Sequence, residues 1–358
     1  MFAQLLAIAQ NTFTESIRQP IYVVLILLGS LGLVLNPSLA AYTLETGGGD
    51  NKLLIDLGLS TVFVVGLFLA AFTATSVLSE EVENRTVLTV VSKPVSRALF
   101  VVGKYAGVAA AIAVAFYLLS VVFALTVRHR VLQTAADSLD MPVITFGVFG
   151  ALAALLVAAG GNYLYRWVFT STFVSCLVVT MTFAWMVVAV MNKDWHLQSP
   201  LTEFTIREGE LTQVLVGLVL IFQAVLILTA IAIAASTRLG QIMTLLVCVG
   251  AFLLGLVSNS LSQWANYRLS LPLGLGPAES LAAIFAADAS FGHQLLYAMA
   301  KVIYLIAPNL QFLWPADAIS LGNPFTVEHI AIVSGYSALY IVAVLGVAVA
   351  LFQTREVG

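Results

Sequence analysis

One segment of this chain gathers acidic and basic side chains in an order that could bind a charged partner. Residues 79–104 read SEEVENRTVLTVVSKPVSRALFVVGK. Acids come first and bases follow, namely Glu80, Glu81 and Glu83, then Arg85, Lys93, Arg97 and Lys104. Such a protruding element could dock into a cleft of a soluble partner, where charge complementarity sets register and specificity. A solvated loop with basic membrane anchors explains the same charges equally well.

The order of residues within this segment predicts a bent helical element. Acids near a helix start and bases farther along suit the helix dipole. Pro94 interrupts the segment, and Ser96 can cap a second, short helix that begins near Arg97. We therefore expect a charged helix, a bend and an amphipathic helix that leads back to the next apolar run.

The chain lacks the sequence patterns of common catalytic sites. No GxxxxGK[ST] motif is present, so the chain does not bind ATP by that device. Its four histidines lie far apart and form no HExxH motif, and no GxSxG elbow occurs. Cys176 and Cys248 each lie inside an apolar run and are interpreted as small core residues. We predict a non-enzymatic chain that holds no metal or cofactor of its own.

The composition indicates a membrane protein. Of 358 residues, 61% are hydrophobic and 9% are charged, whereas soluble domains carry roughly 25% charged residues. The net charge of −3 and the lack of a basic tract exclude a typical nucleic-acid-binding surface. No separate soluble domain is apparent, so residues 1–358 are expected to form a single transmembrane domain in the lipid bilayer.

Eight apolar runs are long enough to cross the bilayer as helices, which need about 20 residues each. They are residues 21–41, 54–78, 105–127, 143–161, 167–191, 211–236, 240–258 and 330–352. Pro37 should end or kink the first span. Asp56, near the start of the second, is either a functional intramembrane carboxyl or an interfacial residue, and we favour the interface. Residues 1–19 carry one apolar stripe and predict an interfacial helix, with packing on protein as the alternative.

Lys and Arg favour cytoplasmic termini. With the N-terminus inside, the inner segments carry eight basic residues and the outer ones seven. The inner segments are about half as long, so their positive charge is denser. Arg128 and Arg130 go against this rule. The long outer segment, 259–329, contains an apolar stretch at 281–307 that we interpret as short external or re-entrant helices.

The residues of the charged segment resemble a known family of transporters. The order of acids, Thr86, an apolar stretch, Lys93-Pro94, Arg97 and Gly103-Lys104 resembles the cytoplasmic connection between the second and third spans of bacterial type-2 ABC-transporter permeases. The branch it resembles is related to the nitrous-oxide-reductase maturation and gliding-associated permeases. Residues 236–255 and 307–319 look like the second inner turn of that family, which includes Arg238, and its outer motif.

The resemblance covers residues 1–127 and about 211–358, and it implies a six-helix permease core. Residues 143–191 depart from the family as an inserted helical hairpin. Its second half carries hydroxyl side chains that either line a polar path or, as we favour, bond between helices. These are Thr170, Ser171, Thr172, Ser175, Thr180 and Thr182.

The resemblance implies the permease subunit of an ABC exporter in a bacterial cytoplasmic membrane. A second permease copy or homologue and two separate cytosolic ATPase subunits, which bind ATP and Mg, would complete it. The expected ATPase-coupling contacts are Glu80, Glu81, Glu83, Arg85, Thr86, Lys93, Pro94, Arg97 and Lys104. Two other classes stay open: an ion-coupled secondary transporter that uses Asp56, and a non-transporting anchor or assembly factor.

Overall fold

The computed structural model describes residues 2–41, 49–83, 96–132, 137–200, 210–268, 291–315, 318–319 and 325–353. These residues are almost entirely helical. The α-helices are α1 (Phe2–Arg18), α2 (Pro20–Ala40), α3 (Gly49–Glu83), α5 (Arg97–His129), α6 (Met141–Tyr165), α7 (Phe169–Ala189), α9 (Glu210–Ser236), α10 (Gln241–Arg268), α12 (Phe291–Ile306) and α14 (Val327–Gln353). A short 3₁₀-helix, η1, spans Leu310–Leu313.

Eight of the described helices are long and apolar enough to cross a membrane. They are α2, α3, α5, α6, α7, α9, α10 and α14, and each corresponds to one expected span. The 16 residues of α12 fall short of a full crossing, in agreement with the short helix expected within 281–307. The prediction of an all-α polytopic membrane protein is confirmed.

Local sequence signals explain where several helices begin and end. Pro20 occupies the first turn of α2, where its missing N–H costs nothing. The Asp140 Oδ1 accepts a hydrogen bond from the Val143 N–H at 3.3 Å and caps α6. The helix α2 continues through Pro37 and ends at Ala40, so Pro37 does not end the span, and a kink at this proline stays a prediction. In an apolar environment no water competes for the remaining helical hydrogen bonds.

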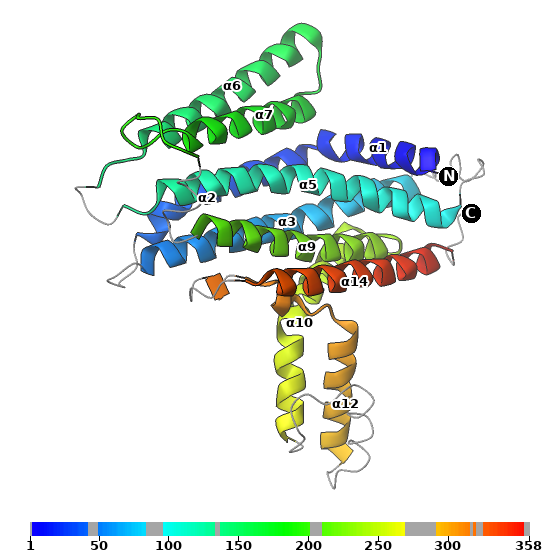
Figure 1. Cartoon of the computed structure of the whole chain (residues 1–358). Coiled ribbons are helices and arrows are strands. Elements are labelled where there is room, and N and C mark those ends of the chain that lie inside the picture. The colour runs from blue at the N-terminus through cyan, green and yellow to red at the C-terminus, as the bar shows by residue number, and fades with distance from the viewer. Residues whose placement is uncertain are drawn as a thin grey trace.

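The centre of the molecule is formed by α3, α5 and α9, which are the most buried of the long helices. Both α2 and α14 pack against this centre, and the Tyr22 hydroxyl of α2 donates to the Ala111 carbonyl of α5 at 2.7 Å. The two chain termini lie at the same end of the bundle (Figure 1). We call this the terminal end, and the opposite end, where α2 and α5 finish, the far end.

The first helix, α1, packs against another helix of the chain, α5. Figure 1 shows α1 beside α5, in line with α2. Gly107 allows this close approach, because a Cβ atom there would lie 2.5 Å from the Ala9 carbonyl oxygen. The helix expected in residues 1–19 is therefore confirmed, and its packing on protein is the alternative that we had left open. Its position relative to a membrane interface stays a prediction.

A helical pair extends from the bundle. Part of α10 packs on α3 and α9, where the Phe252 and Phe63 rings lie 4.8 Å apart. Beyond that contact α10 pairs with α12, and the two extend away from the other helices (Figure 1). The Lys301 ammonium of α12 donates to the Ser262 hydroxyl of α10 at 2.9 Å, and burial lowers the Lys301 pKa.

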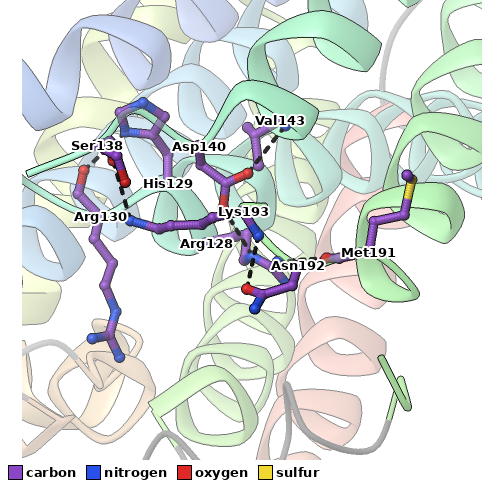
Figure 2. A network of polar contacts seen from close by, with 9 residues as sticks. All are labelled: Arg128, His129, Arg130, Ser138, Asp140, Val143, Met191, Asn192 and Lys193. Atoms are coloured by element: carbon purple, nitrogen blue, oxygen red, sulfur yellow. Dashed lines mark hydrogen bonds and ion pairs between the residues drawn. The ribbon is translucent and has the colours of Figure 1, made fainter. Parts of the chain in front are cut away.

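An ion pair at the far end fixes the α6–α7 hairpin to α5 (Figure 2). The Arg128 Nε lies 3.2 Å from the Asp140 Oδ2, and both side chains are almost completely buried. The Arg128 Nη2 also donates to the Met191 carbonyl beyond α7, at 2.7 Å. Arg128 therefore has a local structural partner, which gives a reason for its position that does not depend on the charge rule.

Removing the Arg128 charge should destabilise the protein strongly. Arg128→Gln leaves the buried Asp140 carboxylate without its counter-charge, which costs about 3–5 kcal/mol. We expect a large fall in the melting temperature of the detergent-solubilised protein. A thiol-reactive dye measures this temperature, because unfolding exposes the free, buried Cys248.

The matched control is Arg166→Gln, because Arg166 is exposed at the end of α6 and its replacement should change stability by less than about 0.5 kcal/mol. Adding Asp140→Asn to Arg128→Gln should recover part of the loss, because no buried charge then remains unpaired. Equal melting temperatures for Arg128→Gln and the control would contradict the assigned role.

Candidate functional site

Two arginines distant in sequence meet at the terminal end, on the last turn of α14. The Arg97 Nη1, at the start of α5, donates to the Gln353 carbonyl at 2.6 Å. The Arg238 Nε and Nη2, in the turn after α9, donate to the Leu351 carbonyl at 3.2 and 2.9 Å. We call this arrangement the arginine clamp. It joins the two inner segments singled out in the sequence, 79–104 and the turn at Arg238, to the last span.

The electrostatics of a helix end explain the arginine clamp. The last carbonyls of a helix lack intrahelical partners and carry a partial negative charge. No basic residue of α14 lies in its own last turn, so its terminal carbonyls are capped by cations from other elements. Stacking adds to the contact, because the Phe100 ring of α5 and the Phe352 ring of α14 lie 5.5 Å apart.

Local structure places Arg97 accurately. The Ser96 Oγ accepts a hydrogen bond from the Leu99 N–H at 3.2 Å, which confirms Ser96 as the cap of the helix that begins at Arg97. The short, separate helix expected here is wrong, because α5 runs without a break from Arg97 to His129. No helix-breaking residue separates the cap from the apolar run. A residue of the charged segment therefore lies on the same rigid helix as the far end.

A second ion pair connects α5 to α1. The Lys104 Nζ lies 3.7 Å from the Glu15 Oε2 and 5.7 Å from the centre of the Phe100 ring. Only 2% of the Lys104 side chain is exposed, whereas Glu15 is one-third exposed. The Lys104 charge therefore faces the first helix of its own chain. Its predicted contact with a partner protein stays a prediction.

The junction of α1 and α2 is also joined to α3. The Ser76 hydroxyl of α3 donates to the Gln19 side-chain oxygen at 2.7 Å. This bond lies less than two turns before the acidic end of α3, where Glu80, Glu81 and Glu83 occupy helical positions. In the half of the bundle nearer the terminal end, polar contacts thus link α5 to α1, α3 to the α1–α2 junction, and α14 to both α5 and the turn after α9.

The structure places only part of the predicted site. Arg97 and Arg238 come together on α14, and Lys104 lies one turn farther along α5 from Phe100. Sequence reasoning missed Glu15 and the carbonyls of Leu351 and Gln353. No sequence signal pointed to these carbonyls, because Arg355 follows the last span closely and could equally have been expected to cap it. The remaining predicted contacts, Arg85, Thr86, Lys93 and Pro94, lie outside the described residues.

The hydroxyl side chains of α7 make contacts of several kinds. The Thr170 hydroxyl donates to the Arg18 carbonyl at 2.8 Å, and the Thr182 hydroxyl lies 2.8 Å from that of Tyr117. Both bonds join α7 to another helix, as we favoured from the sequence. Others bond within their own helix, and an open depression between α6 and α7 is lined in part by Ser171, Thr172, Ser175 and Thr180.

Asp56 lies near the start of α3 at the far end and is half-buried. Within the described ranges, no group of three or more His, Cys, Asp or Glu side chains could hold a metal ion. The polar contacts described at the terminal end join helices of this chain to one another.

Comparison with known families identifies the kind of protein. Residues 6–192 match the family model described as ABC-2 family transporter protein. The chain belongs to this family. As an ABC-2 family member it is a membrane subunit of an ABC transporter. A comparison with curated proteins found no match.

The family match covers a different part of the chain from the resemblance found in the sequence. It begins within α1 and ends just after α7, so it includes the hairpin of α6 and α7 that we expected to depart from the family. It stops before α9, so the stretches 236–255 and 307–319 lie outside it. The charged segment 79–104 lies inside the matched range.

Loss of the arginine clamp should loosen the end of α14. Arg238→Ala removes both hydrogen bonds to the Leu351 carbonyl and a cation at the helix C-terminus. Because the site is exposed, we expect about 0.3–1 kcal/mol of lost local stability, which is roughly two- to fivefold faster amide exchange in the last turn of α14. Hydrogen exchange with mass spectrometry measures this rate.

Arg166→Ala serves as control, since Arg166 is exposed and lies on the hairpin. Exchange in the last turn of α14 should be unchanged in that variant. If Arg238→Ala also leaves it unchanged, the clamp does not stabilise the end of the last span.

Proposed function

We propose that this ABC-2 family protein is the permease subunit of an exporter, driven by ATP that a separate ATPase polypeptide hydrolyses. The terminal end would face the cytosol and receive the ATPase. The observation that carries the proposal is the arginine clamp, in which the charged segment, the turn after α9 and the end of α14 meet on one surface. A partner that moves this surface acts on several helices at once.

The continuous helix α5 supports a mechanical role for the charged segment. Its 33 residues span about 50 Å at 1.5 Å per residue. A displacement of residues 79–104 would therefore be transmitted along α5 to the far end. The arginine clamp would pass the same displacement to α14, and the Lys104–Glu15 pair would pass it to α1. Lys104 would then act through α1.

ATP binding would bring two ATPase subunits together and move two permease copies, or a permease and its homologue, relative to each other. Charge complementarity between residues 79–104 and the ATPase surface would set the register of docking. ATP and Mg would be held by the ATPase, and the bacterial cytoplasmic membrane would be the site of action.

Reversing charge in this segment should uncouple the two subunits. In Lys93→Glu/Arg97→Glu we expect loss of ATPase co-purification and loss of permease-stimulated ATP hydrolysis, because two attractive contacts become repulsive. Pull-down and phosphate release measure the two effects. Lys93→Glu alone, which keeps Arg97 in the clamp, should produce part of both losses.

The matched control is Lys52→Glu/Lys193→Glu, which makes the same change in net charge at the far end. This control should co-purify normally. Intact complex formation and stimulation in Lys93→Glu/Arg97→Glu would refute the coupling assignment.

The proposed orientation predicts which end of the bundle is accessible from outside the cell. In a chain with Cys176 and Cys248 replaced by Ala, we expect Ser138→Cys at the far end to react with a membrane-impermeant thiol reagent on intact cells. Ser96→Cys at the terminal end should react only after the membrane is opened. Both positions are exposed in the structure, so accessibility depends on sidedness. The reverse pattern would refute a cytosolic terminal end.

A further inference from the structure

A cavity of about 520 Å³ lies between α2, α5 and the α6–α7 hairpin. Its α2 wall is a ridge at helical spacing that includes Leu27, Leu31 and Val34. From Leu27 to Ser38, this wall is about 16 Å long at 1.5 Å per residue. We call the cavity the hairpin groove. It follows the direction of the helices from the middle of the bundle to the far end.

Most of the polar groups of the hairpin groove lie at one end. Ser38, Thr126 and His129 line it at the far end, whereas Leu118 and Phe173, together with the single hydroxyl of Ser30, line it near the middle of the bundle. The groove therefore has a mainly apolar shaft and a polar mouth. This distribution fits an amphiphile whose head lies at the far end.

The hairpin groove is a built site rather than a loose gap. Val143 and Ile144, in the first turn of α6, line it, and this turn is capped by Asp140. The carboxylate of Asp140 is in turn paired with Arg128, which also bonds to the end of α7 (Figure 2). The buried network thus fixes the wall formed by the hairpin relative to α5.

The groove opens toward the surroundings of the bundle. Leu31 and Val34 on one side and Val148 on the other line it and are about half-exposed or more. In a membrane protein these apolar side chains face hydrocarbon, where water is absent. The apolar part of the groove offers water few hydrogen-bond partners. Its opening faces the bilayer, from which an occupant can enter.

The dimensions of the groove select between the occupants that a membrane offers. The groove is about 16 Å long, close to half of the ~30 Å hydrocarbon layer, which is the depth that one acyl chain covers. A membrane-spanning helix of a second copy or of another protein is about 30 Å long and would extend well past the groove. A single acyl chain that ends at the polar mouth is the bilayer component that matches both the length and the lining of the groove.

We propose that the hairpin groove binds one acyl chain of a membrane phospholipid, with the headgroup at the far end. The chain lies between α2 and the hairpin, and it supplies the packing contacts that the tilted hairpin leaves open. The polar mouth at Ser38 and His129 receives the ester and headgroup region. This site is separate from the terminal end, so it does not depend on the proposed ATPase coupling.

The chain offers a matched pair of glycines to test this site. Both Gly147 and Gly160 lie on α6, and a Cβ atom at either would meet nothing within 4 Å. Gly147 lines the hairpin groove, whereas Gly160 is not among its lining residues. Gly147→Trp should fill the groove, and Gly160→Trp should add the same indole elsewhere on the same helix.

The probe is a phosphatidylcholine with a photoreactive diazirine in one acyl chain. The purified protein is incubated with it in a sterol-based detergent that offers no flexible alkyl chain, freed of excess lipid by gel filtration, and irradiated. We expect retained label on groove residues such as Leu118, Phe173 and Met181 in the wild type and in Gly160→Trp. We expect loss of this label in Gly147→Trp. Peptide mass spectrometry locates the label.

Two results would overturn the proposal. The first is wild-type protein that retains no label in the groove, which needs no variant and is independent of folding of the mutants. The second is Gly147→Trp that keeps the wild-type label while it melts at the wild-type temperature. Cross-links between chains through Val34→Cys, with no retained lipid, would instead assign this face to a second copy.

Discussion

Charged side chains in an apolar environment have to find partners, and this requirement determines how the helices are joined at both ends of the bundle. An unpaired buried charge costs several kcal/mol, so the position of each of the few buried charges constrains which helices can pack together. At the far end Arg128 and Asp140 join the hairpin to α5. At the terminal end Lys104 faces Glu15, and Arg97 and Arg238 reach the carbonyls of α14.

The two ends differ in what these contacts allow. At the far end both partners are almost completely buried, so the hairpin is fixed to α5. At the terminal end the arginine clamp is exposed and consists of hydrogen bonds to carbonyls, which are weaker and can be replaced by water. A surface that is held together but can rearrange suits the docking site that we propose for the ATPase. The rigid far end suits a stable binding groove.

The eight long apolar helices could be predicted because their signals are local. A run of about 20 apolar residues has no other low-energy structure in a bilayer than a helix. The cap at Ser96 and the short length of α12 follow from local spacing in the same way. The continuous α5 could not be foreseen, because whether a helix continues past a charged residue such as Lys104 depends on a partner, Glu15, that is 89 residues away.

The sequence by itself determined the fold class, the eight helices that are long and apolar enough to span a membrane, and the two basic segments before α5 and after α9, since apolar periodicity and charge are properties of the chain alone. Only the tertiary structure decided which charges meet. It brought Arg97 and Arg238 to one helix end and gave Arg128 its buried partner. It also opened a groove between α2 and the hairpin. Packing between helices is set by shape over long sequence separations, and no local pattern encodes it.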